Sequence, residues 1–147
     1  GKEGTIADVT TEGRRRLIVD TNLKQAEGRG AFERDNDPDV LLTEPAREFV
    51  RVEARMVPRH DWGVRWDIAR RVAGDMTATL SASGRMVAKA SSKIWFWLSR
   101  FKEPWAPFDF NSGMGLRNVS RKDAVQLGVV GQGEIVQPLE LPASLQN

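Results

Sequence analysis

One block of aromatic residues, Trp95 to Phe110, constrains the fold of this chain more than any other stretch. Its sixteen residues hold three of the five tryptophans and four of the six phenylalanines. Each such ring buries roughly 150–250 Å² of surface when it enters a core. The block therefore predicts a large part of the hydrophobic core, and it carries no residue pattern typical of a catalytic site.

The first part of the block predicts a short helix over residues 93–101. Ser91 and Ser92 precede it and offer N-caps. Four apolar residues share one helical face and are expected to point inward: Ile94, Trp97, Leu98 and Phe101. Trp95 lies to one side of this stripe, so we expect it to be less covered.

The second part of the block predicts an extended elbow. Pro104 and Pro107 stop the helix, and residues before proline avoid the α region. Residues 111–115, Asn-Ser-Gly-Met-Gly, then supply positions that tolerate positive φ in a tight turn. A short strand is expected over 116–119, and Ser120 is expected to cap a helix over 121–127 that Gly128 ends.

Residues 47–57 give the clearest strand. Apolar Val50, Val52, Ala54 and Met56 alternate with charged Arg51, Glu53 and Arg55. This period of two predicts an antiparallel sheet with an apolar face and a charged, solvated face. Two weaker alternations, over 76–83 and 85–90, predict a hairpin around Ser83 and Gly84.

Two longer helices are expected before and after that strand. The segment 12–34, capped by Thr10 or Thr11, places five residues on the face of Ile18: Thr21, Asn22, Gln25, Arg29 and Phe32. Asn22 and Gln25 then bond backbone groups or contact a ligand or partner. Gly28 and Gly30 either permit close approach of another element or mark the end of the helix. The segment 61–73 stacks Trp62 and Trp66, between an N-cap at Asp61 and a C-cap at Gly74.

These patterns predict an α+β fold in one domain, a small antiparallel sheet packed against several helices. At 147 residues with 40% hydrophobic and 29% charged content, the chain has the composition of a globular domain. We expect residues 1–13 to be poorly structured, 14–130 to form the domain, and 131–147 to be an extended tail.

Charge and composition restrict the function classes. The net charge of +2 does not argue for nucleic acid. The chain has no cysteine and one histidine, so a zinc site of the usual Cys/His type is not expected, and no metal or cofactor is predicted. No apolar run approaches the ~20 residues of a membrane-spanning helix.

Three charged features leave alternatives open. The run Arg14–Arg16 is either a contact for phosphate or an acidic partner, or a solvated face. The acidic segment 33–39 is interpreted as a solvated turn, because it lacks the glycine and distal glutamate of an EF-hand loop. His60 adjoins Asp61, but neighbours in sequence point apart, so the pair is not read as a catalytic dyad.

Two segments resemble a known family. Trp105–Gly128 (WAPFDFNSGMGLRNVSRKDAVQLG) looks like the C-terminal signature of phage head-morphogenesis proteins, the phage Mu protein F-like minor head family. Arg16–Gly30 is similar to a helix of that family with a Thr-Asn pair followed by small residues. Many members have a Pro-Pro pair and a Cys-Arg-Cys stretch where this chain has Ala106-Pro107 and Ser112-Gly113-Met114.

The resemblance implies a minor head component that acts in capsid assembly or DNA packaging alongside portal and capsid proteins, in the virion or the bacterial host cytoplasm. We therefore expect a non-enzymatic protein that works through protein–protein contacts. The residues expected to contact a partner are Trp95, Trp105, Pro107, Phe108, Phe110 and Asn111.

A second hypothesis is a small nuclease or RNA-binding domain. A sheet with flanking helices can present basic side chains to a phosphate backbone. The residues that would line such a phosphate-binding face are Arg51, Arg55, His60, Arg65 and Arg70.

Overall fold

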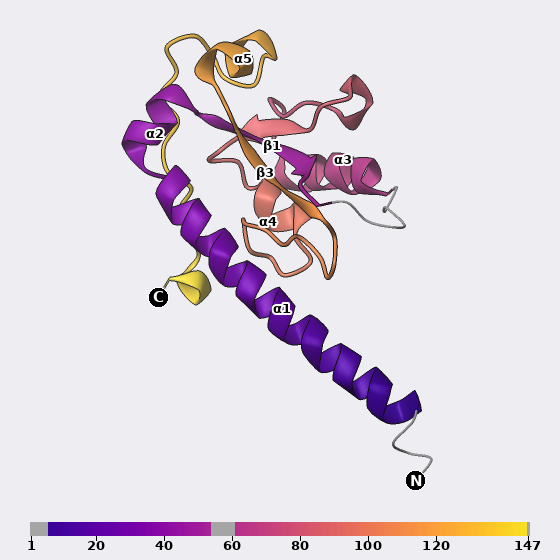
Figure 1. Ribbon diagram of the computed structural model, residues 1–147. Helices are drawn as coiled ribbons and strands as arrows, with labels where there is room; N and C mark the ends of the chain where they lie inside the picture. Colours follow the sequence, from indigo (N-terminus) through magenta and orange to yellow (C-terminus); the bar gives the residue numbers. More distant parts are fainter. Residues whose placement is uncertain (1–5, 54–60, 147) are drawn as a thin grey trace.

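A three-stranded antiparallel sheet, with strand order β2-β1-β3, organises the fold (Figure 1). The computed structural model describes residues 6–53 and 61–146, the side chains of 6–10 and 12 excepted. In these ranges, the α+β class predicted from the sequence is confirmed. The helices and strands are α1 (Ile6–Asp35), α2 (Pro38–Thr43), β1 (Ala46–Arg51), α3 (Trp62–Ala73), β2 (Val87–Lys89), α4 (Ile94–Leu98), β3 (Met114–Val119) and α5 (Arg121–Gln126), with short 3-10 helices η2 (Ser81–Ser83) and η3 (Ala143–Leu145).

Strand β1 is central, and the prediction of a charged face on it is wrong. Phe49 shares a face with Arg51 but is only 2% exposed, because its ring packs on Trp62 at 5.0 Å and on Phe108 at 5.1 Å between centroids. Val52, expected on the apolar face, is 58% exposed. The large aromatic surface of Phe49 decides which face is inward. The predicted strand residues 54–57 lie outside the described residues.

The core has two parts, one on each face of the sheet. The larger part is mostly aromatic and includes Phe49, Trp62, Trp66, Trp95 and Phe108. The smaller part is aliphatic and includes Ala46, Val87, Val119, Ala124, Val129 and Val136. Leu139 joins the larger part, so the extended C-terminal segment packs onto the domain at two positions and does not simply trail over its surface.

Helix α4 is shorter than predicted and presents a different face. It ends at Leu98, and Ser99 is extended. Trp95 is 1% exposed, with its ring 5.5 Å from that of Trp66 and its indole N–H donating to the Lys89 carbonyl at 3.0 Å. Trp97 is 48% exposed. The predicted inward face is therefore wrong at Trp97, and the expectation that Trp95 has little cover is wrong as well.

The other local predictions have mixed outcomes. Helix α3 begins at Trp62 and ends at Gly74 (φ 68°) as predicted, although the Asp61 side chain accepts no capping hydrogen bond. The Ser120 hydroxyl accepts from the Asp123 backbone N–H at 3.2 Å, which confirms the cap of α5. The hairpin over 76–90 is wrong, because its first half forms bends and η2, and β2 pairs with β1 instead.

Candidate functional site

Helix α1 is the most unusual element of the described structure, because its first half extends beyond the rest of the domain (Figure 1). At 30 residues it is about 45 Å long. Its second half packs on loops. The Phe32 ring lies 5.3 Å from the Trp105 ring, the Gln25 amide donates to the Glu103 carboxylate at 2.8 Å, and Arg29 donates to the Leu145 carbonyl at 2.8 Å. Residues 6–13, which were expected to be poorly structured, are part of this helix.

Glu103 shows that the contact between α1 and these loops is partly shielded from water. Burial raises the pKa of its carboxyl group, and the nearby Arg29 guanidinium opposes this effect. The Gln25 amide donates to the same carboxyl group, so its partner is a side chain of the domain, where the sequence had suggested a backbone group, a ligand or a partner. Asn22, expected on the same face, is exposed.

Gly28 of α1 lies directly against the segment 104–113, which we call the elbow. A Cβ atom at Gly28 would lie 1.9 Å from the Ala106 carbonyl oxygen. A Cβ atom at Gly30 would have no heavy atom within 4 Å. Of the alternatives left by the sequence, close approach therefore holds for Gly28. Neither glycine ends the helix, which continues to Asp35.

The elbow itself has the predicted turn. Asn111 has φ 53° and Gly113 has φ 71°, and the peptide bond between Ala106 and Pro107 is cis. A cavity of about 260 Å³ lies between the elbow and α1, and its lining includes Pro107 and Asn111 together with Thr21 and Lys24.

Most of the residues predicted to contact a partner are part of the core. Trp95 is 1% exposed, Trp105 2% and Phe108 0%, and Pro107 is buried too. The prediction that this set forms a contact surface is therefore wrong for these four side chains. Phe110 is half-buried, with its ring perpendicular to that of Phe101 at 4.9 Å, and Asn111 is exposed.

An exposed apolar stripe on α1 was missed by the sequence analysis. Val19 is 58% exposed and Leu23 61%, and Ala26 and Gly30 continue the stripe at helical spacing. This stripe lies on the side of α1 opposite to the contacts made by Gln25, Gly28 and Phe32. Ile18, expected at the centre of the inward face, is 49% exposed. The spacing of Val19, Leu23 and Ala26 was the available signal.

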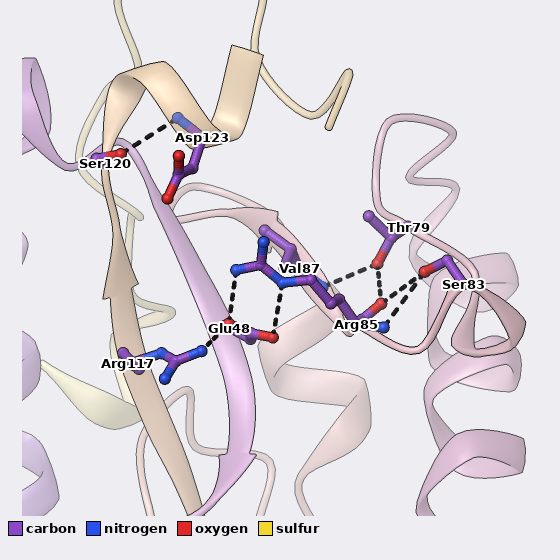
Figure 2. A network of polar contacts seen from close by, with 8 residues as sticks. All are labelled: Glu48, Thr79, Ser83, Arg85, Val87, Arg117, Ser120 and Asp123. Atoms are coloured by element: carbon purple, nitrogen blue, oxygen red, sulfur yellow. Dashed lines mark hydrogen bonds and ion pairs between the residues drawn. The ribbon is translucent and has the colours of Figure 1, made fainter. Parts of the chain in front are cut away.

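The face of the sheet that carries Ala46 and Val87 also carries an ionic cluster (Figure 2). Glu48 of β1 is 5% exposed and accepts two hydrogen bonds from Arg85, at 3.1 and 2.9 Å, and a third from Arg117 of β3. The bond from Arg85 lowers the pKa of Glu48, burial opposes this effect, and Arg117 adds to it. Because both guanidinium groups bond one carboxylate, the cluster links β1 to β3 and to the loop before β2.

The arginines of the phosphate-binding hypothesis bond the protein itself. Arg51 donates to the Ser112 carbonyl at 3.3 Å. Arg65 stacks 3.9 Å above the Trp62 ring and donates to the Asp109 carboxylate at 3.1 Å. Arg70 donates to the carbonyls of Ala78 and Met76, at 2.9 and 3.1 Å. Arg55 and His60 lie outside the described residues.

The acidic segment 33–39 contains the predicted turn, at residues 36 and 37, and its other residues belong to the ends of α1 and α2. Helix α1 continues to Asp35, and α2 begins at Pro38 with the Asp37 carboxylate accepting from the Asp39 N–H at 2.8 Å. Within residues 6–53 and 61–146 no group of three acidic or histidine side chains is arranged to hold a metal ion. In the same part of the chain no helix has the length and apolar content needed to cross a membrane.

Comparison with protein-family models, curated proteins and solved structures finds no match to this chain. The resemblance of residues 16–30 and 105–128 to phage head proteins therefore stays a prediction.

Proposed function

We propose that this chain is a non-enzymatic minor head protein of a phage or prophage, which takes part in capsid assembly through protein–protein contacts. The sequence resemblance described above suggests the biological setting, in the virion or the host cytoplasm. The two segments that carry the resemblance also pack together, since Gly28 of one lies against Ala106 of the other. They act as one structural unit, which supports reading them as parts of a single signature.

The observation that carries the proposal is the exposed apolar stripe of α1, which begins at Val19 in the projecting half and continues along the half that packs on the loops. An apolar helix face that stays exposed to solvent in its own domain is typical of a surface that binds another protein. Val19 and Leu23 would supply the apolar contacts, and the exposed Arg15 lies one turn before Val19 on the same side of the helix. The partner is accordingly a portal or capsid protein with an apolar groove flanked by acidic side chains.

The nuclease or RNA-binding alternative receives no comparable support from the described residues. Arg51, Arg65 and Arg70 each donate to carbonyl or carboxylate groups of this chain. The first two bond the elbow, at Ser112 and Asp109, and Arg70 bonds the loop after α3. A phosphate-binding face instead needs guanidinium groups that point together into solvent.

Co-purification tests the proposal. The tagged chain is co-expressed with the portal and capsid proteins of the same phage locus, alongside the double variant Val19→Glu/Leu23→Glu. The control, Val64→Glu/Val72→Glu, changes two valines of α3 that are 62% and 55% exposed. We expect the wild type and the control to retain a head protein, and the α1 variant to lose it. If the wild type retains neither protein, or the α1 variant retains as much as the wild type, the proposal is wrong.

A further inference from the structure

A groove beside α4 contains the exposed tryptophan. Trp97 is 48% exposed, whereas the other four tryptophans are at most 3% exposed. The groove has a volume of about 630 Å³, within the range of roughly 300–1,000 Å³ typical of ligand sites. Phe96 and Trp97 line one side, and Leu141 and Pro142 of the C-terminal segment line the other.

Two lysines flank Trp97 in this groove. Lys93 precedes α4 and Lys102 follows it, and both are exposed. Lys102 has the left-handed φ of 56°, which is unfavourable for a residue with a side chain. Its ammonium group lies 5.5 Å from the centroid of the Trp97 ring. The side of the groove formed by α4 thus combines an apolar ring with two positive charges, while Glu140 places one negative charge in the C-terminal segment.

We propose that this groove binds an extended peptide segment of another protein, with an apolar side chain against Trp97 and carboxylates next to it that pair with Lys93 and Lys102. Tryptophan is enriched at the energetically dominant positions of protein interfaces, so an exposed tryptophan in a groove is suited to bind a partner's side chain. Single-stranded nucleic acid suits the groove less well, because Glu140, Leu141 and Pro142 would face its phosphates. The inference does not depend on the role proposed for α1.

Two blocked peptides with the same apolar centre test the inference, Glu-Leu-Phe-Leu-Glu and Lys-Leu-Phe-Leu-Lys. Each carries a fluorescent label, and binding to the full chain is followed by anisotropy. A second readout is acrylamide quenching of tryptophan emission, which reports on Trp97 because the other tryptophans are buried. We expect the acidic peptide to bind with a Kd below about 1 mM, to protect Trp97 from quenching, and to bind more weakly as salt is raised.

Variants separate the two parts of the groove. Trp97→Ala should weaken the acidic peptide about tenfold or more, and Lys93→Glu/Lys102→Glu should reverse the preference between the peptides. Lys122→Glu, an exposed lysine of α5, is the matched control and should change little.

Three results would each overturn the proposal. They are no saturable binding of the acidic peptide up to about 1 mM, equal binding of the two peptides, and an unchanged preference in the double lysine variant. Displacement of the bound acidic peptide by a thymidine oligonucleotide of higher affinity would assign the groove to nucleic acid and overturn it too.

Discussion

Replacing Gly28 by alanine probes the contact between α1 and the elbow. The new Cβ atom would lie 1.9 Å from the Ala106 carbonyl oxygen, whereas real Cβ atoms essentially never lie closer than 3.0 Å to such an atom. The helix and the elbow would have to separate by about 1 Å, because a backbone oxygen has no rotamer by which it can move aside. Such overpacking costs about 1–3 kcal/mol. The higher helix propensity of alanine offsets about 1 kcal/mol of this loss.

Gly30→Ala is the matched control, two residues further along the same helix and on its opposite side. Its Cβ atom meets nothing within 4 Å, so the substitution should stabilise the protein by about 0.5–1 kcal/mol through helix propensity alone. Urea unfolding of the three proteins measures the difference as a shift in midpoint at constant slope. We expect Gly28→Ala to unfold earlier than wild type and Gly30→Ala later. If Gly28→Ala is as stable as Gly30→Ala, the described packing of α1 on the elbow is wrong.

Three further predictions concern the core, the ionic cluster and a helix cap. Trp95→Ala should cost about 3–5 kcal/mol of unfolding free energy and Trp97→Ala far less, because only Trp95 is buried; equal costs would contradict the assigned face of α4. Glu48→Gln should cost about 1.5–3 kcal/mol at pH 7. The hydrogen bond from Arg85 lowers the pKa of Glu48, so this stabilisation is present above the ordinary glutamate pKa and is lost as the pH falls through the lower, folded-state value. The difference in unfolding free energy between wild type and variant, measured by urea titration, should therefore shrink on acidification. A difference that does not depend on pH would refute the ionic contribution. Ser120→Ala should cost about 1 kcal/mol in thermal or urea unfolding, and no change would mean that the hydroxyl does not cap α5.

Several features encoded over a few neighbouring residues were predicted correctly from the sequence, although the hairpin over 76–90 and the side-chain cap at Asp61 were not. Ser120 begins α5 because its hydroxyl bonds a backbone N–H three residues later, a contact that depends only on local geometry. Gly74 ends α3 for a similar reason, since a left-handed residue is needed there. The turn with Asn111 and Gly113 at positive φ belongs to the same class.

Features decided by contacts distant in sequence were predicted poorly. The face of α4 depends on Trp66, whose ring packs on Trp95 from another helix. The C-terminal segment is held by Asn36, which exchanges two hydrogen bonds with the Leu139 backbone across 103 residues. No local pattern encodes such a contact.

The same distinction between local and distant contacts explains which parts of the candidate site could be predicted from the sequence. Aromatic content marked the elbow as important but did not show that Trp105 and Phe108 point into the core. The exposed stripe of Val19 and Leu23 has a regular helical period, yet only the packing of the opposite face on the elbow shows that it points away from the domain.

The most direct test of the central claim is the affinity of purified portal and capsid proteins for this chain and for its Val19→Glu/Leu23→Glu variant, measured by biolayer interferometry. We predict saturable binding of at least one of these proteins to the wild type, and binding at least tenfold weaker for the variant, equivalent to about 1.4 kcal/mol. Equal affinities for the two forms, or no binding to the wild type, would contradict the account.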